Sequence, residues 1–111
     1  MHAGVFIANA CQEGKEMVYL ALGPASNLAF AQKLNRDIVH SFKRVFVCGG
    51  TDNYFGTAHY ASDFNFHYDP DAMFLIFRRF PSIYVLPVET VFDFNVTPEL
   101  VEKMRGHGSK I

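Results

Sequence analysis

The chain has 111 residues with a net charge near −1, and half of them are hydrophobic, including 12 Phe and 5 Tyr. This length predicts one small domain, and this composition predicts a packed core. Lys and Arg are few and scattered, which excludes the basic surface of a nucleic-acid-binding protein. Charged residues make up 19%, below the usual quarter of a soluble domain, so we expect other polypeptide to cover part of the surface.

The first two predicted elements are a helix and a strand. Apolar residues recur at helical spacing over residues 2–13 and predict a helix, ended by Gly14, whose inner face consists of Ala3, Phe6, Ile7, Ala10 and Cys11. Residues 17–22 are a continuous apolar run that stops at Gly23. Such a run is typical of a strand that is buried on both faces of a parallel sheet.

A second helix is predicted after this strand. Ser26 or Asn27 can supply its N-cap, and its inner face is expected to consist of Leu28, Ala31 and Leu34. Residues 37–42 add a short helical piece. The pattern then repeats, because residues 45–48 predict a second buried strand that two glycines halt.

The remaining chain predicts a loop, two helices and a third strand. Residues 51–62 are polar and follow no clear period, and so long a loop in a compact domain is usually functional or disordered. Residues 69–80 begin with Asp-Pro-Asp, which predicts a helix with an Asp N-cap and Pro at its first position. Residues 83–86 predict the third strand, and residues 97–104 predict a last helix that ends at residues 106–108.

The alternation of strands and helices predicts an α/β fold with an open, mostly parallel sheet and flanking helices. In such a sheet, ligands bind beyond the carboxyl ends of the strands. Those ends are expected at residues 22–24, 48–50 and 87–89. Their glycines either let backbone approach a ligand or simply make tight turns.

The polar segment 61–69 carries the most chemistry. Asp63 and Asn65 are two residues apart, so in an extended chain their side chains point to the same side and suit the vicinal hydroxyls of a sugar. The alternative is that both are solvated loop residues, or that Asn65 holds the following turn. His59 and His67 could be drawn with Asp63 as a metal cluster, although this spacing matches no zinc pattern.

The two cysteines predict free thiols rather than a catalytic centre. Cys48 follows a buried strand and precedes two glycines, but no partner base can be assigned to it. Cys11 and Cys48 are both expected to be buried in a protein of a reducing compartment. No signal peptide and no apolar run of about 20 residues is visible, which predicts a cytoplasmic protein without a membrane span.

Four segments, taken in order, resemble one family. Residues 22–29 read LGPASNLA, residues 47–50 read VCGG, residues 62–72 contain SDFN and DPDA, and residues 86–90 read LPVET. These are similar to the LGPLTNLA, VMGG, AEFN with DPEA, and PLD or PWET segments of inosine-uridine preferring nucleoside hydrolases. Their order and spacing agree over nearly the whole chain. The resemblance implies the middle segment of that family's Rossmann-like domain.

The resemblance also implies an activity and a set of site residues. The family hydrolyses the N-glycosidic bond of ribonucleosides to ribose and free base, and it uses Ca²⁺. The backbone carbonyl of Leu22 is the implied metal ligand, and the implied ribose contacts are Cys48, Thr57, Asp63, Phe64 and Asn65. Three of these depart from the family, since Asp63 replaces Glu, Cys48 replaces Met and Thr57 replaces Asn.

Nothing in the chain resembles the family's N-terminal aspartate cluster, which supplies the general base, or its C-terminal segment with the leaving-group His. We therefore expect residues 1–111 to form a partial domain that has no catalytic residue, binds Ca²⁺ weakly or not at all, and aggregates on its own. The complete protein is expected to be a homo-oligomer acting on nucleosides in purine salvage. The alternatives are a truncated, non-catalytic relative that binds a ligand or a partner, and an unrelated α/β nucleotide-binding module.

Overall fold

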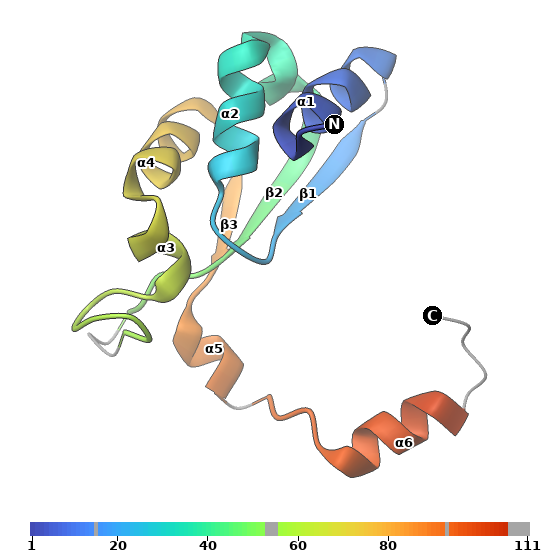
Figure 1. The fold of residues 1–111 in the computed structure, drawn as a ribbon, viewed down its shortest axis with the longest axis vertical. Helices are drawn as coiled ribbons and strands as arrows, with labels where there is room; N and C mark the ends of the chain where they lie inside the picture. Colours follow the sequence, from blue (N-terminus) through green and yellow to red (C-terminus); the bar gives the residue numbers. More distant parts are fainter. Residues whose placement is uncertain (15, 53–55, 93, 107–111) are drawn as a thin grey trace.

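A computed structural model describes residues 1–14, 16–52, 56–92 and 94–106, and within them three strands form one sheet. The strands are β1 (Met17–Ala21), β2 (Phe42–Cys48) and β3 (Ile83–Leu86), in the order β1-β2-β3. Both pairs are parallel. Figure 1 shows helices joining the strands, so the predicted α/β fold with an open parallel sheet is confirmed.

The helices lie between the strands and after the last one. The connection from β1 to β2 contains α2 (Ser26–Leu34) and the 3₁₀ helix η2 (Arg36–His40). The connection from β2 to β3 contains α3 (Phe64–Tyr68) and α4 (Pro70–Arg79). The chain starts with α1 (Ala3–Ala10) and η1 (Cys11–Glu13), and β3 is followed by α5 (Val88–Phe92) and α6 (Pro98–Gly106).

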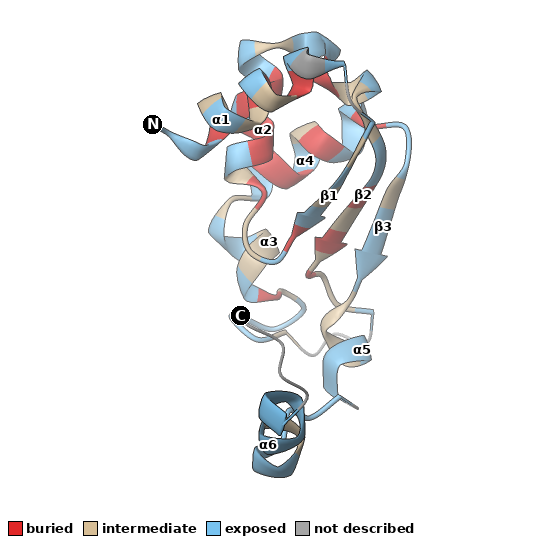
Figure 2. Ribbon diagram, turned by 90° about the vertical axis from the view of Figure 1, so that its right-hand side faces the viewer, coloured by how far each residue is buried: buried red, intermediate tan, exposed pale blue. Residues whose placement is uncertain are grey.

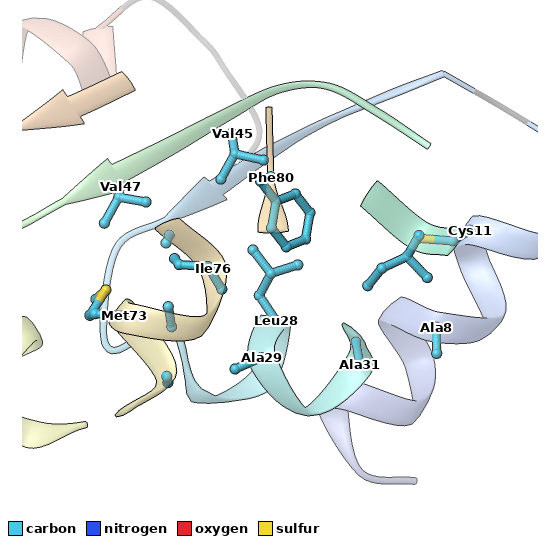
Figure 3. Packing of buried hydrophobic residues seen from close by; sticks show 14 residues of the cluster. Ala8, Cys11, Leu28, Ala29, Ala31, Val45, Val47, Met73, Ile76 and Phe80 are labelled. Atoms are coloured by element: carbon cyan, nitrogen blue, oxygen red, sulfur yellow. The ribbon is translucent and has the colours of Figure 1, made fainter. Parts of the chain in front are cut away.

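The core lies on one face of the sheet. Figure 2 shows α1, α2 and α4 packed on the same side of the three strands. In the close-up of Figure 3, Leu28 of α2 and Ile76 of α4 lie against Val45 and Val47 of the central strand. All four side chains are at most 1% exposed.

The opposite face of the sheet is open. Val18 and Leu20 of β1 are 58% and 57% exposed, and Tyr84 and Leu86 of β3 are also exposed. The prediction that the strand at residues 17–22 is buried on both faces is therefore wrong for this structure. The physical reason is visible in Figure 2, where no helix covers that side of the sheet in the part of the chain that is described.

The first helix is confirmed, but its buried face differs from the prediction. Gly14 ends η1 with a positive φ of 68°, as expected for a C-terminal glycine. The buried residues are Gly4, Ala8 and Cys11, whereas Phe6 is 59% exposed. A Cβ on Gly4 would lie 2.5 Å from the ring of Phe30 in α2. The two helices thus approach each other closely where Gly4 meets Phe30, and a larger residue at position 4 would not fit.

The second helix begins one or two residues earlier than predicted, at Ser26. Its N-cap is Ala25 without a side-chain hydrogen bond, so neither Ser26 nor Asn27 caps it. Leu28 and Ala31 are buried as expected, but Leu34 is 53% exposed at the last position of the helix. The short helical piece is also shorter than expected, because β2 already begins at Phe42.

The later caps agree with the sequence. The Asp69 carboxylate accepts the N–H of Ala72 over 3.0 Å at the start of α4, and Thr97 Oγ1 accepts the N–H of Leu100 over 3.2 Å at the start of α6. The predicted end of the last helix falls partly on residues 107 and 108, which lie outside the described residues.

Two short helices, α3 and α5, were not predicted. Each has five residues, which is too short for a helical period to show in the sequence. Figure 1 places them beyond the carboxyl ends of the strands, with α6 further from the sheet. Among the described helices, none has the length and apolar character needed to cross a membrane.

Candidate functional site

A cavity of about 190 Å³ lies beyond the carboxyl ends of β2 and β3. It contains all five of the residues predicted as ribose contacts, and its lining consists of Cys48, Gly49, Thr57, Asp63, Phe64, Asn65, Val88 and Val91. This is the edge of the sheet where ligands of parallel α/β proteins bind. The cavity is smaller than the roughly 300–1,000 Å³ of a typical ligand pocket. It therefore fits one sugar-sized part of a ligand.

Asp63 is buried and faces backbone amides. It is 4% exposed and is the N-cap of α3. Its Oδ1 accepts the N–H of Asn65 over 2.9 Å, and its Oδ2 accepts those of Gly50 and Phe66 over 2.5 and 3.3 Å. A carboxylate has about four acceptor positions, so one remains for a ligand hydroxyl. The extended geometry expected for residues 63–65 is wrong, because α3 starts at Phe64.

Asn65 joins the ends of two strands. Its Nδ2 donates to the carbonyl oxygen of Cys48 over 2.8 Å and, more weakly, to that of Leu22 over 3.5 Å. Leu22 directly follows β1, and Cys48 is the last residue of β2. The Leu22 carbonyl and the Asn65 side chain consequently lie on the same side of the sheet. Within the described residues, no hydrogen bond is made to Asn65 Oδ1, which leaves that oxygen for a hydroxyl donor.

Thr57 and Phe64 complete this wall of the cavity. Thr57 Oγ1 accepts the N–H of Phe64 over 2.9 Å, and the hydroxyl hydrogen of Thr57 is still a donor. Phe64 is 56% exposed, and its ring centroid lies 5.7 Å from that of Tyr68. The cavity thus combines hydrogen-bonding groups with an apolar surface.

The two glycines after β2 are required by the backbone and by close packing. Gly49 and Gly50 have positive φ angles of 146° and 81°. A Cβ on Gly49 would lie 2.8 Å from Asp63 Oδ1 and 2.9 Å from the Phe66 ring. A side chain at Gly49 would therefore displace the carboxylate that caps α3.

The third wall of the cavity is α5, a helix that the sequence did not predict, although it placed a strand end at residues 87–89. Val88 and Val91 line the cavity from this helix. Between them, Glu89 Oε1 accepts the hydroxyl of Thr51 over 2.5 Å and the N–H of Asp52 over 3.1 Å. The available signal was positional, because these residues directly follow the carboxyl end of the third strand.

The described residues do not form a metal site by themselves. Calcium takes six to eight oxygen ligands. Among the residues that the structure describes, no group of three or more His, Cys, Asp or Glu side chains could hold a metal ion. His59 and His67 stack with centroids 6.5 Å apart, but the Asp63 carboxylate faces backbone amides. The Leu22 carbonyl is the one predicted ligand, and it accepts from Asn65.

The cysteines are free thiols, as predicted. Cys11 is buried, and burial raises the pKa of its thiol, although a hydrogen bond with Ser41 acts in the opposite direction. This favours the unreactive thiol form of Cys11 at neutral pH. Cys48 is half-buried and lines the cavity.

The fold and the cavity define an α/β domain with a small polar site at the carboxyl edge of a parallel sheet. The chain belongs to the inosine-uridine preferring nucleoside hydrolase family, because the sequence model of that family matches residues 1–111. This family membership confirms the resemblance seen in the sequence and sets aside an unrelated nucleotide-binding module.

One curated protein is similar to the chain in sequence, and solved structures are similar to it in fold. The chain is 29% identical over 109 residues to a protein described as probable uridine nucleosidase 2 of Oryza sativa subsp. japonica. The aligned region covers 97% of this chain and 32% of that protein. The fold of this chain is similar to that of the inosine-uridine preferring nucleoside hydrolase from Bacillus anthracis, with a TM-score of 0.82 and 21% identity. The superposition covers 95% of this chain and 37% of the other.

A third relative shares the fold in the same way. The purine-preferring ribonucleoside hydrolase from Gardnerella vaginalis has a TM-score of 0.81 and 24% identity, over 97% of this chain and 34% of its own. The chain therefore spans about one third of the length of these relatives.

Proposed function

We propose that this chain is part of a nucleoside hydrolase that cleaves the N-glycosidic bond of ribonucleosides to ribose and free base, and that its cavity holds part of the ribose. One observation carries the proposal. Asn65 donates to the carbonyls of Leu22 and Cys48 at the ends of β1 and β2, and it lines one cavity together with the other four predicted ribose contacts. Family membership and the relatives named as nucleosidases support the same reading.

The groups in the cavity match the chemistry of a pentose. Sugar hydroxyls both donate and accept hydrogen bonds. Asp63 has a remaining acceptor position, Asn65 Oδ1 is an acceptor, and the Thr57 hydroxyl is a donor. The Phe64 ring supplies an apolar surface for the C–H groups of the sugar. These residues bind and orient the pentose. Holding a substrate in its reactive geometry lowers the activation free energy of the reaction.

The extent of the domain and the metal ligand are also part of this proposal. Residues 1–111 are a partial domain, and the Leu22 carbonyl becomes a Ca²⁺ ligand only together with carboxylates that the described residues do not contain. The general base likewise has no candidate among the predicted site residues. We therefore expect no nucleoside hydrolysis by this chain alone. Its cytoplasmic location, its role in purine salvage and the homo-oligomeric state of the complete protein stay predictions.

A second candidate function is that of a non-catalytic relative which binds a sugar or a partner. It is favoured by the absence, among the described residues, of any group of three or more His, Cys, Asp or Glu side chains that could hold a metal ion. The two candidates are separated by an assay of base release from uridine and inosine on the longest natural protein that contains these residues. The first candidate predicts release of uracil or hypoxanthine, and the second predicts none.

Binding of ribose is tested by NMR titration of the ¹⁵N-labelled chain with D-ribose and with 2-deoxyribose. We expect D-ribose in the millimolar range to shift the side-chain amide of Asn65 and the backbone amides of Thr57 and Phe64. The Asn65→Ala variant should lose the response, whereas Asn95→Ala, at an exposed position, should keep it. A response that is absent, or unchanged in Asn65→Ala, would mean that the cavity is not a ribose site.

A further inference from the structure

The carboxylate of Glu89 has no place in the proposed ribose contacts, yet its neighbours adjoin the cavity. It lies on α5, between the two valines that line the cavity. Its Oε1 accepts both the Thr51 hydroxyl, over 2.5 Å, and the Asp52 N–H, over 3.1 Å. A single carboxylate oxygen thus accepts hydrogen bonds from two residues of the segment that follows β2. Hydrogen bonds to a charged acceptor are stronger than those between neutral groups.

The α5 helix depends on such anchors for its position. It has five residues, which is far below the length at which an isolated helix is stable in water. The described backbone bond from α5 to the segment after β2 is made by the N–H of Val88, which donates to the carbonyl of Gly50 over 3.0 Å. The Glu89 carboxylate adds the side-chain anchor next to that bond.

The segment after β2 is held by two carboxylates from different helices. On the α3 side, Asp63 accepts the N–H of Gly50, and on the α5 side, Glu89 accepts the N–H of Asp52. Gly50 and Asp52 are two residues apart, so the segment between them is fixed at both ends. The relative positions of α3 and α5, which both line the cavity, are set through this shared segment.

We propose that Glu89 is a positioning residue: by holding the segment 50–52 it places Val88 and Val91 against the cavity and so sets the width of the ligand site. Only the identity of the ligand, a pentose, rests on the proposed function. The anchoring itself follows from the contacts of Glu89 with Thr51 and Asp52.

Two variants remove the anchor from opposite ends, and a third serves as a control. Glu89→Ala removes the acceptor, and Thr51→Val removes one donor while keeping the carboxylate. Glu16→Ala removes an exposed carboxylate that pairs with Lys43 over 3.4 Å, away from the cavity. Hydrogen exchange of the Asp52 and Val88 amides, the thermal midpoint and the dissociation constant of D-ribose are measured for each variant.

We expect Glu89→Ala to speed exchange of the Asp52 and Val88 amides by about tenfold and Thr51→Val to speed it by about threefold, since each removes one or two hydrogen bonds. Ribose affinity should fall in the same order, and the double variant should resemble Glu89→Ala because the two residues share one contact. The thermal midpoint should fall no further than in Glu16→Ala, a combination that a purely structural role would not produce.

The inference is overturned if both variants keep the exchange rates of the Asp52 and Val88 amides within about twofold of the parent protein. It is also overturned if Glu89→Ala weakens ribose binding while Thr51→Val does not and exchange is unchanged, because Glu89 would then contact the sugar directly. A parent protein that shows no ribose response contradicts the proposed function instead, and the exchange rates then decide the role of Glu89 alone.

Discussion

Asp63 and Asn65 are two positions apart, but their side chains have different surroundings. The Asp63 carboxylate faces three backbone amides at the start of α3 and the end of β2. The Asn65 amide reaches the carbonyls at the ends of β1 and β2. The sequence could predict that both residues belong to one site. It could not predict these roles, because they depend on a helix that starts between them.

Asp63→Asn tests the buried carboxylate. One acceptor oxygen becomes an amide nitrogen. Because both oxygens of Asp63 accept backbone N–H groups, this nitrogen faces a donor in either orientation and leaves it unsatisfied. We expect a loss of about 1–3 kcal/mol in the free energy of unfolding, measured by urea denaturation. The control is Asp37→Asn at an exposed carboxylate, where a loss of the same size would contradict the structural role of Asp63.

Gly49→Ala tests the close approach of the backbone to α3. The added methyl group meets Asp63 Oδ1 and the Phe66 ring, and the backbone already has a φ of 146°. We expect destabilisation of about 1–3 kcal/mol together with loss of any ribose response. Gly23→Ala is the matched control, since nothing lies within 4 Å of its Cβ. It should change the free energy of unfolding by less than about 0.5 kcal/mol.

At the scale of elements, the sequence predicted the regular parts of the fold and missed the short ones. The strand at residues 83–86 and the Asp69 cap are confirmed, because an apolar run between turns and an Asp-Pro start are local signals. Helices α3 and α5 have no local signal of this kind. They are held by contacts such as the one between Asp63 and Gly50, which are distant in sequence.

The cap of α4 predicts a dependence of stability on pH. The hydroxyl of Ser26, the N–H of Ala72 and the charge of Lys33 lower the pKa of Asp69 below its ordinary value near 4. A carboxyl whose pKa is lower in the folded state stabilises the protein above the unfolded-state pKa, and this contribution is lost as pH falls through the folded-state pKa.

The measurement compares the unfolding free energies of the parent protein and Asp69→Asn between pH 7 and pH 3. The parent should be more stable at neutral pH, and the difference should shrink below about pH 4. Asp71→Asn, at an exposed carboxylate in the first turn of the same helix, should show a smaller change. A difference that grows on acidification would show that the sign assigned to Asp69 is wrong.

At the scale of the whole molecule, the open sheet face is the main feature. The strands have apolar residues on both of their faces, yet helices cover only one of them, as Figure 2 shows. The exposed edge strands β1 (MVYLA) and β3 (IYVL) contain no charged residue. Natural edges are normally protected by charge or covered. The apolar runs in the sequence predicted burial on both faces of the sheet, and the described residues bury only one of them.

Self-association through this face is the expected behaviour of the isolated chain. Leu20→Lys, at 57% exposure on the open face, should raise the concentration at which aggregates form, as measured by light scattering. The matched control is Leu34→Lys, at 53% exposure on the helical side, which should have little effect. Equal effects of the two variants would count against the open face as the source of association.

The central feature of the proposed function is that the end of β2, the start of α3 and α5 line one cavity that holds a pentose. Intermolecular NOEs between ¹³C-labelled D-ribose and the labelled protein test it most directly. We expect NOEs from the sugar protons to the Thr57 methyl group, the Phe64 ring and the Val91 methyl groups. NOEs confined to the separate cavity beside Lys33 and Leu75, or none at saturating ribose, would contradict it.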